Sequence, residues 1–559
     1  MHHKLKLLAL TAALLTGCAT PPPTPPSGPV KVKILAINDF HGNLKPPLGG
    51  IRVKDPANPG KLMNIEAGGA EYLATAVAEL RAKNANHIFV AAGDLIGATP
   101  LLSALFHDEP TVEALSLMGL EVSSVGNHEF DKGATELLRM QRGGCSPLDG
   151  CKGPSQFKGA AYKYLAASTV DMKTGQTLFP PYHVKTFEGI PVAFIGLTLK
   201  GTPSIVVPSG VAGLRFDDEA ETVNRLVPEI RKQGIEAIVV LIHEGGMPAG
   251  DYNECPGISG PIVEIVKKLD KAVDLIVSGH THRAYNCRID GRLVTSGDKY
   301  GTIVSEIDIV LDPATRDLVS AQANNVIVRN AVFAKDPKQT ALIEQYDKLA
   351  VPLAKRVVGR AGAALPRDSN PAGENVLGQV IADAQLAATR GPEAGGAQIA
   401  FMNPGGIRAA LGMPADGLVR YEDLFSIQPF YNNLVTMTLS GAQVLTLLEQ
   451  QWHSKPDGET GGRVMQVSQG FKYTWDSARP VNQRVVPGSA RLNGQPIDPL
   501  GNYRVTCNAF MASGGDSFLM LRLGTERVTG IMDVDALELY VKANPMLLPG
   551  KLDRITRLN

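Results

Sequence analysis

The sequence predicts an α/β protein that folds as two domains joined by a linker helix. Three observations carry this prediction. Short β-branched runs recur through the first half of the chain, and each ends in a turn that carries Asp, Asn or His. A polar segment with helical periodicity follows at 338–358, where Pro352 is expected to kink or break the helix. Alternating helix and strand patterns then fill the remainder of the chain.

Five predicted strands of the first half end in residues that can bind a metal. The strands cover 32–37, 88–92, 122–125, 237–242 and 273–277, and the residues that follow them are Asp39, His41, Asp94, Asn127, His128, Glu129, His243, His280 and His282. Ligands of open α/β sheets bind at the carboxyl ends of strands, so we expect these turns to share one crevice. Oxygen and imidazole ligands without thiolate suit Zn, Mn, Fe or Co. One such turn alone is typical of ordinary structure, but the ordered set predicts a metal site.

The second half contains helix patterns at 375–389 and 442–452 and strand patterns at 397–402 and 434–439. Three of its turns combine glycine, aromatic and polar side chains that suit a planar, phosphorylated ligand. Their candidate binding residues are Asn403, Gly405, Gly406, Arg408, Phe430, Asn432, Phe510 and Asp516. Each residue alone is more typical of a core position or a turn, so the prediction depends on their combination.

The motifs Asp39-x-His41, Gly93-Asp94, Gly126-Asn127-His128-Glu129, His243 and Gly279-His280-x-His282 resemble the calcineurin-like metallophosphoesterases. The closer resemblance is to the bacterial periplasmic 5′-nucleotidase/UDP-sugar hydrolase family. It covers nearly the whole chain after its first residues. It implies an N-terminal α/β/β/α metallophosphoesterase sandwich and a C-terminal α/β nucleotide-binding domain.

The resemblance also implies a role for each ligand. Two divalent transition-metal ions (Zn, Mn, Co or Fe) would share Asp94. Asp39, His41 and His282 would complete one site, and Asn127, His243 and His280 the other. Several relatives carry Gln in place of His282. His128 would face the substrate and be oriented by Asp131, although an outer structural role for His128 is the alternative.

In the second half, the resemblance implies that Arg408 binds phosphate, that Phe430 and Phe510 stack on a base, and that Asp516 contacts the base or the ribose. Asn403 and Asn432 match polar contacts of the family. The family usually places a further arginine just before the helix that begins near Asn375, where this chain has Ala372 and Gly373. Arg367 lies slightly upstream, and the sequence leaves open whether it substitutes.

The first residues resemble a bacterial lipoprotein signal that ends at Leu15-Thr16-Gly17-Cys18, followed by a proline-rich tether. An ordinary signal peptide is the alternative. We expect a lipid anchor on Cys18 and an extracytoplasmic, periplasmic, membrane-bound protein. The expected segments are the signal at 1–18, the tether at 19–29, the metal domain at 30–335, the linker at 336–358 and the substrate domain at 359–559.

The remaining cysteines favour disulfides if the protein is exported. Cys145 and Cys151 bracket a short loop, and Cys255 and Cys287, expected on loops near the metal site, are a second candidate pair. Cys507 is expected to be a buried free thiol. Sequence does not fix this connectivity.

The predicted function is metal-dependent hydrolysis of nucleoside 5′-monophosphates, with nucleotide sugars and di- or triphosphates as further candidates. The alternatives are a 2′,3′-cyclic nucleotide phosphodiesterase/3′-nucleotidase and a non-catalytic nucleotide-binding or adhesive surface protein. Acidic and basic residues number 55 each, so charge does not favour a nucleic-acid polymer. No feature of the sequence indicates an obligate protein partner.

Overall fold

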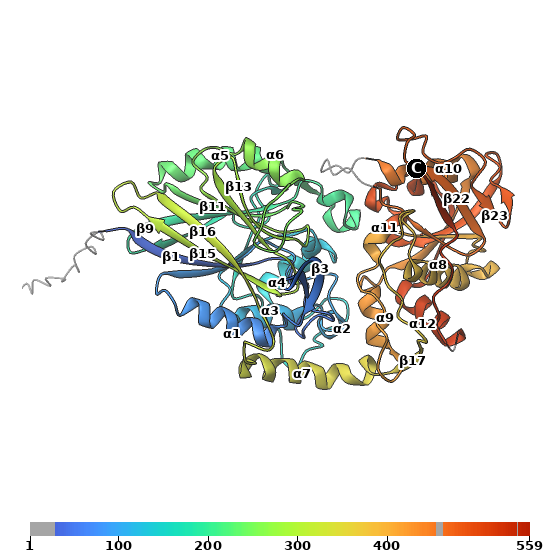
Figure 1. Ribbon diagram of the computed structural model, residues 1–559, viewed down its shortest axis with the longest axis horizontal. Helices are drawn as coiled ribbons and strands as arrows, with labels where there is room; N and C mark the ends of the chain where they lie inside the picture. Colours follow the sequence, from blue (N-terminus) through green and yellow to red (C-terminus); the bar gives the residue numbers. More distant parts are fainter. Residues whose placement is uncertain (1–27, 454–461, 545) are drawn as a thin grey trace, which may run out of the picture.

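A computed structural model describes residues 28–453, 462–544 and 546–559. The predicted signal, Cys18 and most of the predicted tether lie outside these residues. The described chain forms an N-terminal half and a C-terminal half, and helix α7 (Pro337–Ala354) runs beneath the N-terminal half and ends at the C-terminal half (Figure 1). No helix in the described ranges has the length and apolar character of a membrane span.

The N-terminal half has four layers, α/β/β/α, as the family resemblance implied. Its first sheet has the order β16-β15-β1-β4-β5-β6, and its second has the order β13-β14-β12-β11-β9-β8. The strands of the first sheet are β1 Val30–Ile37, β4 His87–Ala91, β5 Val122–Ser124, β6 Lys163–Leu165, β15 Ile303–Leu311 and β16 Leu318–Ile327. Those of the second are β8 Tyr182–Phe187, β9 Ile190–Thr198, β11 Ala237–His243, β12 Leu275–Ser278, β13 Ala284–Ile289 and β14 Arg292–Gly297.

Apolar side chains of β1, β4, β9 and β11 meet between the two sheets, where Val32, Val90, Phe194 and Val239 are fully buried. A helix layer covers the outer face of each sheet. The layer on the first sheet contains α1 Ala70–Arg81, α3 Glu109–Met118 and α4 Ala134–Arg142, with the short α2 Leu101–Ala104 beside it. The layer on the second contains α5 Glu219–Lys232 and α6 Pro261–Lys268. The parallel strands β1, β4, β11 and β12 all carry buried faces on both sides, which explains their continuous apolar runs.

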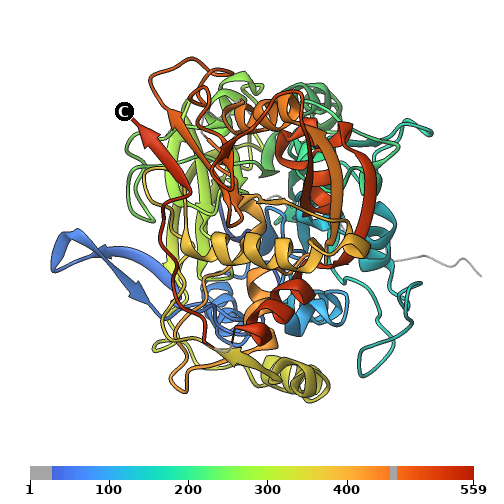
Figure 2. The same ribbon diagram turned by 90° about the vertical axis from the view of Figure 1, so that its right-hand side faces the viewer.

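Three two-stranded sheets lie outside the larger sheets of the two halves. The hairpin of β2 (Ile51–Asp55) and β3 (Asn58–Ile65) projects from the body in the end-on view (Figure 2). The pair of β7 (Thr169–Asp171) and β10 (Leu214–Phe216) lies in the N-terminal half. The pair of β17 (Val357–Arg360) and β19 (Leu418–Arg420) begins the C-terminal half.

The C-terminal half contains a five-stranded sheet of order β21-β18-β25-β20-β26 and a four-stranded sheet of order β24-β23-β22-β27. Their strands are β18 Ile399–Met402, β20 Asn433–Ser440, β21 Gln466–Val467, β22 Phe471–Asp476, β23 Arg491–Leu492, β24 Gln495–Pro496, β25 Asn502–Asn508, β26 Thr525–Met532 and β27 Ile555–Leu558. The α-helices are α8 Val376–Thr389, α9 Tyr421–Ile427, α10 Gly441–Glu449, α11 Ala509–Ala512 and α12 Asp533–Ala543. Asn375 begins α8 by accepting a hydrogen bond from the Gly378 amide, which explains the start of the predicted helix.

Helix α7 corrects one expectation. Pro352 does not break the helix, because α7 continues to Ala354. Pro352 lies in the last turn, where its missing N–H removes only one intrahelical hydrogen bond. The predicted helical segment is shortened instead at its end, since Val357 already belongs to strand β17. The helix is held on the N-terminal half by Gln339, which donates to the Ala114 carbonyl at 2.9 Å.

Both expected disulfides are present, and Cys507 is a buried free thiol. The bridge from Cys255 to Cys287 joins the loop after β11 to the sheet. One detail differs from the expectation, because Cys287 lies within strand β13 rather than on a loop.

Candidate functional site

Five of the predicted ligands have backbones in the left-handed region. Their φ angles are 50° for Asp39, 44° for His41, 50° for Asp94, 69° for His280 and 53° for His282. Such angles are uncommon for residues other than glycine, and each costs roughly 1–3 kcal/mol. The tight turns direct these side chains into the space between the strand ends. The strained backbone positions of the five ligands are therefore concentrated at the predicted metal site.

Two glycines make this convergence possible. Gly93 precedes Asp94 with a φ of 82°, and a Cβ added to Gly126 would lie 2.1 Å from Asp94 Oδ1. The turns after β4 and β5 therefore approach more closely than any side chain at Gly126 would allow.

Asp39, His41 and His282 form the first cluster, with ligand atoms within 4.8 Å of one another. His282 Nε2 lies 3.3 Å from Asp39 Oδ1 and 3.2 Å from His41 Nε2. His41 Nδ1 donates to the Gly97 carbonyl at 2.8 Å when its ring is neutral, which leaves the Nε2 lone pair facing the cluster. Burial lowers the pKa of His41 and of His282 well below the usual value, so both rings are neutral, as metal ligands must be.

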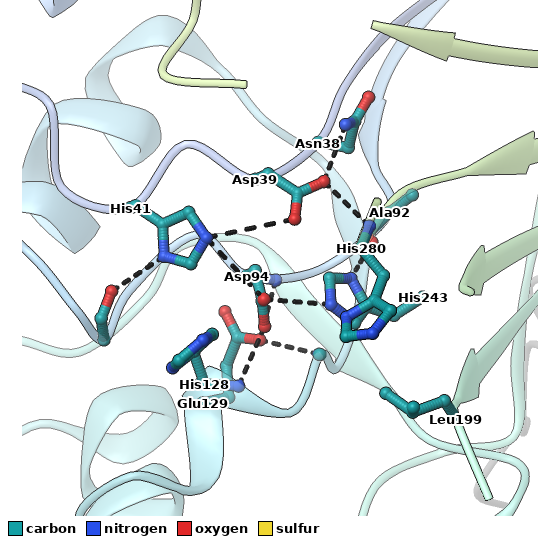
Figure 3. Close-up of polar contacts among 12 residues, drawn as sticks. Asn38, Asp39, His41, Ala92, Asp94, His128, Glu129, Leu199, His243 and His280 are labelled. Atoms are coloured by element: carbon teal, nitrogen blue, oxygen red, sulfur yellow. Dashed lines mark hydrogen bonds and ion pairs between the residues drawn. The ribbon is translucent and has the colours of Figure 1, made fainter. Parts of the chain in front are cut away.

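Asp94, His243 and His280 form the second cluster. Asp94 lies beside His243 and His41, and Figure 3 shows these two rings close to its carboxylate. Asp94 Oδ2 is 2.9 Å from His243 Nε2 and 3.7 Å from His41 Nε2, so one oxygen faces both clusters. Burial would lower the pKa of His243, but the Asp94 carboxylate outweighs it and raises that pKa to about 10. The pair thus favours a positive charge between its atoms, whether a proton or a metal ion.

The donor set fits divalent cations. Asp39 Oδ1 and Asn127 Oδ1 are buried, and within the described part of the chain neither has a hydrogen-bond partner. A buried acceptor without a partner is costly unless something else neutralises it. Carboxylate, amide and imidazole ligands together match the preferences of Zn, Mn, Co and Fe.

Glu129 belongs to one of the predicted metal-ligand turns, but among the described residues it is in none of the ligand groups and contacts the backbone instead. Its Oε2 accepts from the amides of Gly126 at 2.6 Å and Asp94 at 2.9 Å, and its Oε1 accepts from Leu95 at 2.7 Å. Burial raises the pKa of this carboxyl to about 7. Glu129 therefore ties the turns after β4 and β5 together. The motif contained this residue, but only the tertiary contacts reveal the tie.

His128 borders the cavity toward the C-terminal half, and a ring nitrogen of His128 also lies within 4.8 Å of ligand atoms of His41 and Asp94. Its Nδ1 is 2.8 Å from Asp131 Oδ2, and its backbone amide donates to Asp94 Oδ1 at 2.8 Å. Burial alone would lower the pKa of His128, but Asp131 and then Asp94 outweigh it and raise the pKa. The ring stacks on Phe430, with centroids 5.9 Å apart and an interplanar angle of 20°.

The turns of the C-terminal half form a polar network beside two aromatic rings. Asn403 donates to Asp516 Oδ2 at 2.7 Å, and Asn508 donates to Asn403 Oδ1 at 3.0 Å. The Arg408 guanidinium lies 5.8 Å from the centre of the Phe430 ring.

The two halves share one cavity of about 550 Å³, a volume typical of small-ligand sites. All eight candidate binding residues of the C-terminal half line it: Asn403, Gly405, Gly406, Arg408, Phe430, Asn432, Phe510 and Asp516. The N-terminal half contributes Asn127, His128, Asp131 and His280 among others. The remaining predicted ligands, Asp39, His41, Asp94, His243 and His282, lie behind this wall in the clusters described above.

Arg367 does not line the cavity. Its Nη1 donates to the carbonyls of Ile407 at 3.0 Å and Arg408 at 2.7 Å, so it supports the turn from behind. A different arginine, Arg463, lines the cavity and pairs with Asp516 at 3.0 Å. No local motif marked Arg463, because its partner lies 53 residues away in the sequence (516 − 463).

The chain matches the calcineurin-like phosphoesterase family over residues 32–284 and the 5′-nucleotidase C-terminal domain family over 356–522. It is 32% identical to Endonuclease YhcR of Bacillus subtilis over 93% of its own length, but it spans only 40% of that protein. It is 30% identical to cell wall protein Lmo0130 of Listeria monocytogenes, covering 92% of this chain and 67% of that one.

Among solved structures, the 5′-nucleotidase precursor from Thermus thermophilus is similar, with a TM-score of 0.76 at 25% identity, covering 95% of this chain and all of that one. The phosphoesterase family matches the half that contains the metal-ligand turns, and the 5′-nucleotidase C-terminal domain family matches the half that contains the other wall of the cavity. The solved structure matches across both halves. The chain therefore belongs to the 5′-nucleotidase family of calcineurin-like metallophosphoesterases.

Proposed function

We propose that this protein hydrolyses nucleoside 5′-monophosphates to a nucleoside and phosphate. One observation carries the proposal. His128 borders a cavity whose other walls hold an aromatic pair and an arginine, and the two metal-ligand clusters lie directly behind it. In a nucleoside phosphate, the base would match the aromatic pair, and the phosphate would match the arginine and the two metal-ligand clusters.

Asp39, His41 and His282 would hold one metal ion, Asn127, His243 and His280 the other, and Asp94 both. Two divalent ions would supply charge neutralisation at the phosphoryl group and activation of the attacking water. The chain's own contribution is to hold these ligands in place, since His41 and His243 are oriented by backbone carbonyls and Asp39 by Asn38, whose Nδ2 donates to Asp39 Oδ2 at 2.7 Å.

His128 would donate a proton to the leaving 5′ oxygen. The raised pKa keeps the imidazole charged at higher pH than an ordinary histidine, and Asp131 fixes Nδ1 so that Nε2 carries the transferable proton. The same charge would stabilise the negative oxygens of the transferring phosphoryl group.

The C-terminal half would hold the nucleoside. Phe430 and Phe510 would stack on the base, Arg408 would grip the phosphate end, and Asp516 with Asn403 and Asn432 would bind polar edges. Gly405 and Gly406 leave room for the ligand to approach the backbone. Nucleotide sugars and di- or triphosphates carry the same nucleoside, so we include them as further substrates.

We also propose that the protein acts outside the cytoplasm, with a lipid on Cys18 as its membrane anchor. The disulfide from Cys255 to Cys287 favours an oxidising compartment, and a relative is named as a cell wall protein.

A second candidate function is phosphodiester cleavage, including that of 2′,3′-cyclic nucleotides. The name of Endonuclease YhcR, a relative at 32% identity, favours testing it. A purely binding or adhesive role accounts less well for the cavity, because nucleotide binding does not require a His128–Asp131 pair beside two ligand clusters.

The test is a substrate panel assayed on the full chain with and without added Zn, Mn, Co or Fe. We expect phosphate release from nucleoside 5′-monophosphates that chelation abolishes and metal restores. Conversion of 2′,3′-cyclic nucleotides to nucleoside monophosphates, without turnover of nucleoside 5′-monophosphates, would favour the diesterase. No turnover of any phosphate ester by a metal-loaded chain would contradict the hydrolase proposal.

A further inference from the structure

Arg463 brings a second guanidinium into the cavity, close to the candidate base clamp. Its Nη1 lies 3.0 Å from Asp516 Oδ1, and its side chain is 19% exposed. The backbone amide of Arg463 donates to the Gln451 carbonyl at 2.7 Å, which fixes the chain behind it. A guanidinium has five N–H donors. Within the described ranges, the guanidinium of Arg463 forms an ion pair with Asp516.

Arg408 and Arg463 reach the same turn by different routes. Arg408 Nη1 approaches the carbonyl of Gly405 at 3.5 Å. Arg463 pairs with Oδ1 of Asp516, and Oδ2 of the same carboxylate accepts a hydrogen bond from Asn403 in the turn. Oδ2 also lies next to Gly405, since a Cβ added to that glycine would be 3.5 Å away. The turn at 403–406 is thus approached directly by Arg408 and, through the Asp516 carboxylate, by Arg463.

A nucleotide placed in this cavity has its sugar between the phosphate and the base. If Arg408 holds the 5′-phosphate and the two phenylalanines hold the base, the sugar lies against the turn. The sugar oxygens then face Asp516 and Arg463. A carboxylate alone would bind sugar hydroxyls and repel an anion, whereas an arginine beside it can accept a phosphate on the ribose.

We propose that Arg463 binds a second phosphate on the 3′ side of the ribose, so that ligands phosphorylated at both the 5′ and the 3′ positions bind more tightly than 5′-monophosphates. This inference rests on the proposed function, because it takes the nucleoside orientation from it. Two sources supply such a ligand: a free nucleoside 3′,5′-bisphosphate, or the 5′-terminal nucleotide of an oligonucleotide.

The experiment compares the Kd of AMP with that of adenosine 3′,5′-bisphosphate by calorimetry on the metal-loaded full chain carrying His128→Ala, in which turnover is slow. A charge-assisted contact to the second phosphate should tighten binding roughly ten-fold to a hundred-fold. Arg463→Gln should bring the ratio of the two Kd values to about one. Arg463→Lys, which keeps a point charge, should retain part of it.

Arg522→Gln is the matched control. Arg522 is an exposed arginine six residues after Asp516 that does not line the cavity, so its loss should leave the ratio unchanged. A ratio near one in the chain that retains Arg463, or a ratio that survives Arg463→Gln, overturns the proposal. Failure of wild-type nucleotide hydrolysis would instead contradict the proposed function, since the titration needs no turnover.

The dinucleotide pApA separates the two sources. Binding as tight as that of the bisphosphate assigns the second phosphate to an oligonucleotide, and weaker binding assigns it to the free bisphosphate. Both results uphold a second phosphate site.

Discussion

The two halves of the molecule build their sides of the cavity in opposite ways. In the N-terminal half, the side chains of Asp39, His41 and Asp94 are at most 1% exposed, and their backbones are held in the left-handed region. In the C-terminal half, Arg408, Phe430 and Phe510 are partly exposed and have ordinary backbone angles, and of the eight candidate binding residues only Asp516 is a non-glycine residue with a positive φ, 55°. Groups that must meet reacting atoms are locked by burial and strain, while groups that select a ligand are carried on more accessible turns.

This contrast has a consequence for mutations. A change in the buried clusters should affect every substrate, because the phosphoryl group is common to all of them. A change in the exposed turns should affect only substrates that carry a nucleoside. The following predictions test this division, from the largest expected effect to the smallest.

Asp94→Asn should cause the largest loss. Its Oδ2 faces both clusters, so the variant should bind fewer metal ions as well as lose activity. A metal ion contributes several kcal/mol to catalysis, which corresponds to a loss of at least roughly 10³-fold in kcat. Elemental analysis together with initial rates would measure both, and the exposed Asp498→Asn serves as the control. Normal metal content and near-normal activity would contradict a shared carboxylate.

His128→Ala should lower kcat by roughly 10²–10⁴-fold while metal content is unchanged. The loss should be smaller for nitrophenyl phosphate, because nitrophenolate leaves without needing a proton. Comparing kcat for the two substrates measures this difference. Equal losses would leave oxyanion stabilisation as the role of His128 and exclude proton donation.

Replacing both Phe430 and Phe510 by Ala should raise KM for nucleoside monophosphates. Stacking is worth roughly 1–3 kcal/mol per base, or about 5- to 150-fold. Nitrophenyl phosphate should be hydrolysed almost normally, since it has no nucleoside. Parallel losses on both substrates would mean that these rings serve the fold, or His128 through its stacking contact, rather than the ligand.

The smallest effect on activity is expected for the last change, which tests stability in the C-terminal half. Burial raises the pKa of Asp533 to about 7, so the folded protein keeps this proton up to about pH 7, whereas an unfolded chain loses it near pH 3.9. The folded state therefore loses stability as pH rises from about 4 to about 7, by at most about 1.4 kcal/mol per pH unit. Asp533→Asn should remove this fall.

Tryptophan fluorescence can follow that transition, because both tryptophans, Trp452 and Trp475, lie in the C-terminal half. Asp274→Asn is the matched control in the N-terminal half, where burial raises the pKa of Asp274 to about 8. We expect Asp274→Asn to leave the fluorescence transition unchanged. If it shifts the transition as much as Asp533→Asn does, the halves unfold as one unit, and the division between them does not extend to stability.

Local signals explain what could be predicted from sequence. The strands that end in ligands combine a β-branched run with a polar turn, and both parts lie within a few residues. Asn375 likewise signals the start of α8. The predicted break at Pro352 is wrong, because a proline in the last turn removes only one intrahelical hydrogen bond and α7 continues to Ala354.

Contacts between distant segments explain what could not be predicted. Glu129 binds amides of the turn at Asp94, and Arg463 meets Asp516 from another part of the C-terminal half. Arg367 was left open as a ligand contact, and only the fold shows that it holds carbonyls of the neighbouring turn. Sequence patterns do not encode which side of a turn a long side chain will reach.

The disulfide between Cys255 and Cys287 closes a loop that carries two of the candidate metal ligands. Its closed loop has a sequence separation of 32 residues and contains His280 and His282. An oxidised but still unfolded chain already confines these two histidines, and closing a loop of this size is worth roughly 3–4 kcal/mol in the chain-entropy description. Reduction of this disulfide should therefore lower the stability of the fold around the two histidines, and with it the affinity of this chain for metal.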